Sequence, residues 1–93
     1  MHKVIKFHAD WCGPCKNYGP IFDKVTNRLT GDWKVEKYNI ESPEGSEIAV
    51  AYGVKSIPTT VIEISGKEQR KLVGALSSDT IAKELTVKKG LVE

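Results

Sequence analysis

Residues 11–16 read Trp-Cys-Gly-Pro-Cys-Lys, and Cys12 and Cys15 are the only cysteines in the chain of 93 residues. Two thiols at this spacing can form a structural disulfide, supply half of a metal site, or alternate between a dithiol and a disulfide. A structural disulfide is disfavoured, because closing a loop of about four residues stabilises a fold by only about 2 kcal/mol in the chain-entropy model. The segment therefore raises the question of what these two thiols do.

The composition restricts the class of protein. Hydrophobic residues make up 40% of the chain and charged residues 28%, with a formal net charge of +2 in mixed signs. These values are typical of a globular domain, with no basic stripe that would bind nucleic acid. No apolar run is long enough to span a membrane, and residues 1–3 lead into a short apolar segment instead of a signal sequence. We therefore expect one monomeric domain over residues 1–93, in the cytoplasm, without a membrane or nucleic-acid partner.

Four segments have the pattern of β-strands. Residues 4–8 form a short apolar run suited to a central strand, and residues 33–40 alternate between polar and apolar side chains. Residues 59–64 and 69–74 are rich in residues that favour strands, and residues 65–68 between them have the composition of a hairpin turn.

Helical patterns lie between these strands. The first helix is predicted from Cys12 to about Leu29, bent by Pro20 and stopped by Gly31, with three residues in the core: Tyr18, Phe22 and Val25.

Two shorter helices follow. Ser42 is expected to cap the second helix, which begins at Pro43 and ends near residues 52–53. Ser77 is expected to cap the third, which runs to about Lys88 with Ile81 and Leu85 facing inward. The end of this third helix should carry two lysines followed by a glycine, namely Lys88, Lys89 and Gly90.

The order βαβαββα predicts how the strands pair. A right-handed crossover makes the first two strands parallel, and the hairpin adds two antiparallel strands beside the first. The expected fold is α/β, a four-stranded mixed sheet in the order 2-1-3-4 flanked by helices. Reactive groups in such a sheet lie beyond the carboxyl end of the central strand, which is the position of residues 9–15.

This position favours redox chemistry by the two cysteines. Cys12 falls at the start of a helix, where free N–H groups and the positive end of the helix dipole stabilise a thiolate. The pKa of such thiols falls to roughly 3.5–7.5. Cys15 lies one turn further in, where we expect it to be less exposed and protonated. Cys12 would therefore attack a substrate disulfide, and Cys15 would resolve the mixed disulfide.

The motifs resemble those of a known family. Trp-Cys-Gly-Pro-Cys-Lys at 11–16, together with Pro20, Ile57-Pro58-Thr59 and Val73-Gly74-Ala75, is similar to the thioredoxin family, and the likeness runs from about Val4 to the last helix. The resemblance implies a thioredoxin-like fold and a protein-disulfide reductase with Cys12 as nucleophile and Cys15 as resolving thiol. It also implies a cis peptide bond before Pro58 and a substrate-contact surface formed by Trp11, Gly13, Pro14, Ile57, Pro58, Gly74 and Ala75.

Two features depart from the family pattern. Only three residues precede the first predicted strand, so we expect a minimal core without the family's usual first strand and helix, closer in size to glutaredoxins. The family's buried acid, which helps to deprotonate the resolving cysteine, aligns with Lys6, and its basic companion is retained as Lys37. Either the Lys6 ammonium reaches water or a carboxylate such as Glu36 or Glu63, or its pKa is depressed enough for the neutral amine to accept the Cys15 proton.

Electrons must come from another molecule, because the sequence contains no nicotinamide or flavin motif. We expect no cofactor beyond the redox-active Cys12–Cys15 disulfide, and no metal. The resemblance implies an NADPH-dependent thioredoxin reductase as electron donor and disulfide-containing proteins such as ribonucleotide reductase as acceptors.

Three alternatives remain open at this point. They are a glutathione-fed, glutaredoxin-like reductant, a non-catalytic interaction subunit with this fold, and a metal-binding module in which His8 or His2 joins the two cysteines.

Overall fold

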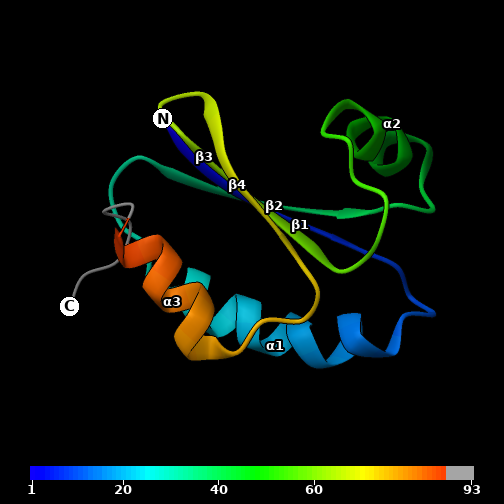
Figure 1. Cartoon of the computed structure of the whole chain (residues 1–93), viewed down its shortest axis with the longest axis horizontal. Coiled ribbons are helices and arrows are strands. Elements are labelled where there is room, and N and C mark those ends of the chain that lie inside the picture. The colour runs from blue at the N-terminus through cyan, green and yellow to red at the C-terminus, as the bar shows by residue number, and fades with distance from the viewer. Residues whose placement is uncertain (88–93) are drawn as a thin grey trace.

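The computed structural model describes residues 1–87, and its elements follow the predicted order (Figure 1). The four strands form one sheet in the order β2-β1-β3-β4, which confirms the predicted order. β1 pairs parallel with β2 and antiparallel with β3, which also pairs antiparallel with β4. The elements are β1 (His2–His8), α1 (Gly13–Thr26), β2 (Trp33–Asn39), α2 (Pro43–Ala51), β3 (Thr59–Ile64), β4 (Lys67–Val73) and α3 (Ser78–Val87).

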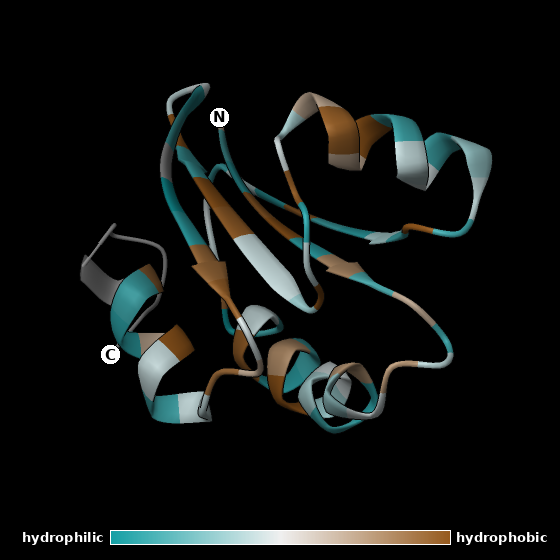
Figure 2. Cartoon of the chain, turned by 45° about the vertical axis from the view of Figure 1, so that its right-hand side comes forward, coloured by the Kyte–Doolittle hydropathy of each residue, from teal (hydrophilic) through white to brown (hydrophobic). Residues whose placement is uncertain are grey.

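Helices cover both faces of the sheet. Figure 1 shows α1 and α3 side by side on one face and α2 on the other. Successive side chains of a strand point to opposite faces, so Val4 contributes to the core under α1 and α3, while Ile5 and Phe7 contribute to the core under α2. Figure 2 shows the apolar residues along the middle of the strands and on the flanking helices. The larger core includes the predicted Tyr18, Phe22, Val25, Ile81 and Leu85.

The predicted helix caps are present. The Ser42 hydroxyl accepts a hydrogen bond from the backbone N–H of Gly45 at 2.9 Å, and Ser77 accepts one from Thr80 at 3.1 Å. Lys88, Lys89 and Gly90, expected at the end of α3, lie outside the described residues. Within residues 1–87, none of the helices is both long and apolar enough to cross a membrane.

The first helix ends earlier than the sequence predicted. Its last residue is Thr26, whose hydroxyl donates to the carbonyl oxygen of Phe22 at 2.8 Å. The N–H groups of Arg28 and Leu29 bond to carbonyl oxygens three residues back, at 3.1 and 3.0 Å, so the chain tightens into turns there. Leu29 still packs against the core, which is why it matched the helical pattern.

Strand boundaries also differ from the prediction. Ser65 and Gly66 both have positive φ, 53° and 82°, which is the conformation of a two-residue type I′ hairpin turn. β4 therefore begins at Lys67 instead of residue 69. β1 begins at His2 instead of Val4, because the His2 N–H bonds to the Asp32 carbonyl oxygen at 2.8 Å. β2 ends at Asn39, one residue before the predicted end.

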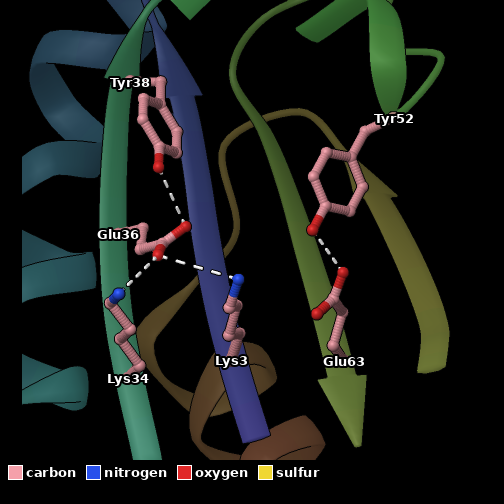
Figure 3. A network of polar contacts seen from close by, with 6 residues as sticks. All are labelled: Lys3, Lys34, Glu36, Tyr38, Tyr52 and Glu63. Carbon is pink, nitrogen blue, oxygen red and sulfur yellow. Dashed lines mark hydrogen bonds and ion pairs between the residues drawn. The ribbon is translucent and has the colours of Figure 1, made fainter. Parts of the chain in front are cut away.

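Polar side chains form a network on the α2 face of the sheet (Figure 3). The Glu36 carboxylate lies 3.3 Å from the Lys34 ammonium and 3.8 Å from that of Lys3, and it accepts a hydrogen bond from Tyr38 at 3.0 Å. Tyr52, the residue that caps the end of α2, donates a hydrogen bond to Glu63 on β3. Burial, followed by this bond to Glu63, raises the pKa of Tyr52. The network engages both acids that were suggested as partners for Lys6.

A buried hydrogen bond joins α1 to the sheet on the opposite face. The hydroxyl groups of Tyr18 and Thr60 lie 2.7 Å apart, and both side chains are fully buried. Burial raises the pKa of Tyr18 to about 12, and the bond to Thr60 opposes this only partly.

We predict an alkaline loss of stability that depends on Tyr18. Between pH 10 and 12 the unfolded tyrosine loses its proton while the folded one keeps it, so the free energy of unfolding should fall by roughly 1.4 kcal/mol per pH unit. Denaturant unfolding of the native chain and of Tyr18→Phe at pH 8, 10 and 11.5 measures this contribution, because other titrating groups cancel in the difference. Equal losses in the two proteins above pH 10 would contradict the prediction.

Candidate active site

The two cysteines lie where the central strand leads into the first helix. Residues 9–11 connect the carboxyl end of β1 to α1, and Cys12 is the residue that caps α1, with extended backbone angles (φ −86°, ψ 111°). Its sulfur accepts a hydrogen bond from the backbone N–H of Cys15 at 3.2 Å. Pro14 occupies the first turn, where its lack of an N–H removes no helical bond. The predicted position of Cys12 at the helix start is confirmed.

Cys12 and Cys15 form a disulfide, with their α-carbons 5.2 Å apart. Each residue is 5% exposed, so the expectation that Cys15 is the less exposed of the two is wrong for this oxidised form. The bond brings both residues into one small apolar cluster with Ala9, against which Ile40 and Ile57 pack. The difference between the cysteines therefore lies in their neighbours, since Cys12 caps the helix and Cys15 lies inside it.

A second loop approaches the disulfide from the other side. The peptide bond between Ile57 and Pro58 is cis, as the resemblance implied. The carbonyl oxygen of Ile57 lies 4.0 Å from the sulfur of Cys12, and the carbonyl oxygen of Pro58 accepts a hydrogen bond from Gly74 at 2.8 Å. Gly74 has φ +99°, a conformation that favours glycine. The structure thus brings Cys12, Ile57, Pro58 and Gly74 together.

Around this group lie exposed residues that the sequence assigned to a contact surface. Trp11 is 67% exposed, and Gly13, Pro14 and Ala75 are exposed as well. Val73 was not among the predicted contact residues, yet it is 64% exposed and lies next to Gly74. Val73 belongs to the segment 73–75 that resembles the family, and this membership is the signal that could have predicted its role. Pro58 differs from the others because it is fully buried, so its side chain lies inside the protein and not on the contact surface.

A small apolar cavity, which no sequence pattern predicted, adjoins the same loop. Its volume is about 170 Å³, and it lies between α2 and the segment before Pro58. Ile40, Val54 and Ile57 line it, together with Val50, which is 77% exposed. Ile40 and Ile57 also pack against the cysteines, so the same two side chains border both the cavity and the disulfide.

A second, more polar cavity lies beside Cys15. Its volume is about 370 Å³, and its lining is Lys6, His8, Ala9, Asp10, Cys15 and Lys16. Lys6 extends from β1 and is 6% exposed. Burial lowers the pKa of Lys6, an effect that Asp23 opposes and Lys37 reinforces.

The carboxylates suggested for Lys6 were wrong. Glu36 and Glu63 lie opposite Ile5 and Lys3 in the strand register, so they share the α2 face of the sheet, whereas Lys6 points toward α1. The acid on the Lys6 side is Asp23 of α1, which forms an ion pair with Lys37 at 2.7 Å. Sequence reasoning missed Asp23, which follows Gly19 by one helical turn on α1. A β-carbon on Gly19 would stand 3.6 Å from the Lys6 ammonium.

The histidines do not complete a metal site with the cysteines. His2 lies at the opposite end of β1, where its ring accepts a hydrogen bond from the backbone of Ser65 at 2.9 Å. His8 lines the polar cavity, and burial followed by Lys6 lowers its pKa. Within residues 1–87, no three side chains of metal-binding type come together. The four-ligand arrangement that the metal-binding alternative requires is therefore not formed by these residues.

Comparison with known sequences identifies the family. The model of the thioredoxin family matches residues 1–87. A thioredoxin from Malassezia sympodialis is 43% identical over 72 residues, covering 77% of this chain and 68% of that protein. One from Chlorobaculum thiosulfatiphilum is 38% identical over 82 residues, covering 88% and 74%. The chloroplastic thioredoxin M4 of Arabidopsis thaliana is 34% identical over 97% of this chain, which spans only 45% of that longer protein.

Solved structures agree with these sequence relatives. A mutant thioredoxin from Halobacterium salinarum superposes with a TM-score of 0.83 at 29% identity, covering 99% of this chain and 78% of that one. The thioredoxin of Fasciola hepatica gives a TM-score of 0.81 at 28% identity, covering 95% and 81%. The family match, these relatives and the disulfide at the helix start show that the chain belongs to the thioredoxin family, whose members with such a cysteine pair are dithiol protein-disulfide oxidoreductases.

Proposed function

We propose that this chain carries electrons to disulfides of other proteins, with Cys12 as the attacking thiolate and Cys15 as the resolving thiol. The observation that carries the proposal is the hydrogen bond from the Cys15 N–H to the Cys12 sulfur at the start of α1. In the reduced protein the same N–H and the positive end of the helix dipole would stabilise a thiolate at Cys12. Exposure does not distinguish the two cysteines. The assignment of Cys12 as the attacking thiolate therefore rests on its position as the residue that caps α1.

The reaction then follows two thiol–disulfide exchanges and a reduction. The Cys12 thiolate attacks one sulfur of the substrate disulfide, forming a mixed disulfide and releasing the other substrate sulfur as a thiolate. The Cys15 thiolate attacks the Cys12 sulfur, so the Cys12–Cys15 bond forms and the second substrate thiolate leaves. The product is the oxidised pair present in this structure. Two electrons from a donor restore the dithiol, and no other cofactor takes part.

The substrate would bind across the exposed surface beside Cys12. An extended peptide can hydrogen-bond to the backbone of Ile57, whose carbonyl oxygen lies 4.0 Å from the Cys12 sulfur. The apolar cavity of about 170 Å³ next to Ile57 can accept one apolar side chain of that peptide. We assign the contacts to Trp11, Gly13, Pro14, Ile57, Gly74 and Ala75, and add Val73 because of its exposure; the buried Pro58 would act by shaping the loop that carries Ile57.

The donor and compartment belong to the same proposal. Family membership implies disulfide-containing protein substrates and a reductase as donor, and we propose an NADPH-dependent thioredoxin reductase, with ribonucleotide reductase among the acceptors. A monomer in the cytoplasm fits this role, because a reductant needs a compartment in which thiols are kept reduced. One relative is named chloroplastic, so the family by itself does not determine the compartment.

The reductase activity is tested by insulin reduction with dithiothreitol as electron source. We expect the native chain to accelerate insulin precipitation, Cys12→Ser to abolish the acceleration, and Cys15→Ser to accumulate a mixed disulfide with insulin on a non-reducing gel. Glu47→Ala, a change at an exposed position of α2 outside the lining of the apolar cavity, is the control for expression and folding. A Cys12→Ser variant as active as the native chain would exclude this mechanism, and an inactive native chain would favour the non-catalytic alternative.

The contact surface is tested by Trp11→Ala. Loss of an aromatic anchor at an interface costs on the order of 1 kcal/mol, so kcat/KM for a protein disulfide should fall roughly fivefold. The rate with a small disulfide such as hydroxyethyl disulfide should change less than twofold. Val35→Ala, which alters another exposed apolar residue, serves as the matched control. Equal losses with both substrates would mean that Trp11 acts on the cysteines and does not bind the partner.

The donor is tested by turnover with each reducing system. With insulin as acceptor, we expect NADPH consumption with thioredoxin reductase to exceed that with glutathione and glutathione reductase by at least tenfold at equal protein concentration. The reverse ratio would support the glutathione-fed alternative. Cys12→Ser provides the background rate for both systems.

A further inference from the structure

Lys6 is the one buried charged residue within residues 1–87, and it lines the same polar cavity as Cys15. Its ammonium is 5.3 Å from the centre of the Phe22 ring and 3.6 Å from where a β-carbon on Gly19 would stand. Cys15, Gly19 and Phe22 follow one another at helical spacing, so they share one face of α1. The ammonium therefore lies against the same face of α1 as Cys15, about one helical turn closer to the carboxyl end of the helix.

The charges around this ammonium compensate it only in part. Asp23 is paired with Lys37, which stands beside Lys6 on β2, and no ion pair to Lys6 occurs within residues 1–87. The other charged or titratable groups in the cavity are His8, Asp10 and Lys16, and Asp10 is the only acid among them. A partly desolvated cation is stabilised by a negative charge placed next to it. A thiolate at Cys15 would supply that charge.

We propose that Lys6 is a positioning residue for the resolving step: its ammonium compensates the negative charge that develops on the Cys15 sulfur. This inference rests on the proposed function, because it concerns the second thiol exchange of that reaction. It assigns to a cation the step that the family assigns to a buried acid. The side chain acts on Cys15 and has no contact with the substrate.

The step is balanced in protons and electrons. The Cys15 thiol gives its proton to the Lys6 amine when that amine is neutral, or to water in the cavity when it is already an ammonium. Both routes end in an ammonium next to a thiolate, and the net charge of the pair is zero. The thiolate then attacks the Cys12 sulfur, the new disulfide forms, and the substrate thiolate leaves with the electron pair of the broken bond.

The first measurement is the thiol pKa of Cys15 in Cys12→Ser, where Cys15 is the single cysteine. An opposite charge nearby lowers a pKa by one unit or more, so we expect a value below the ordinary 8.5 despite burial. Adding Lys6→Met or Lys6→Gln should raise the value by about one unit, and Lys6→Arg should retain most of the shift. A value at or above 8.5 with Lys6 present overturns the proposal, whether or not the Lys6 variants fold.

The second measurement separates the two exchanges kinetically. With Ellman's reagent, attack by Cys12 releases one chromophore and attack by Cys15 on the mixed disulfide releases the second. Lys6→Met should slow the second release about tenfold at pH 7 and shift its pH midpoint upward by about one unit, with the first release changed less than twofold. Lys3→Met, on the same strand but the opposite face, is the matched control.

The outcomes distinguish this proposal from the proposed function. A second release with unchanged rate and midpoint in folded Lys6→Met and Lys6→Gln excludes a role for Lys6. A slow first release in the native chain counts against Cys12 as nucleophile, while the pKa of Cys15 in Cys12→Ser still reports on Lys6.

Discussion

The sulfur of Cys12 occupies the place at which a helix needs a hydrogen-bond acceptor, 3.2 Å from the N–H of Cys15. Serine or aspartate oxygens usually fill this place. A sulfur there places the reactive atom at the positive end of α1 and holds Cys15 one turn away, within bonding distance. Because β1 is a central strand and only residues 9–11 join it to this cap, the buried sheet fixes the position of the redox pair. The loop of Ile57 and Pro58, which leads into β3, completes the site.

The alternation of side chains along β1 separates two sets of charges. Lys3 points to the α2 face and joins the partly buried network around Glu36, whereas Lys6 points to the α1 face and reaches the cavity beside Cys15. Only the second set borders the cavity that Cys15 lines. Asp23 and Lys37 pair with each other at its edge, which leaves the charge of Lys6 available to the sulfur.

Much of the fold could be predicted because local patterns and the motif agreed. The strand order followed from the crossover rule, and the caps at Ser42 and Ser77 followed from residue type. The errors arose where tertiary contacts determine the end of an element, the partner of a side chain or its exposure. The hydrogen bonds of Thr26 end α1 early, and the tight turn at Ser65 and Gly66 extends β4. The partner of Lys37 and the equal exposure of the cysteines depend on which surfaces meet, and periodicity alone does not contain that information.

The acidity of Cys12 tests the central claim most directly. The rate of alkylation by iodoacetamide, measured from pH 4 to 10 in Cys15→Ser, reports the pKa of the Cys12 thiol without interference from the second sulfur. The cap and the helix dipole predict a midpoint between roughly 3.5 and 7.5. A midpoint near 8.5, that of an ordinary thiol, would contradict the account.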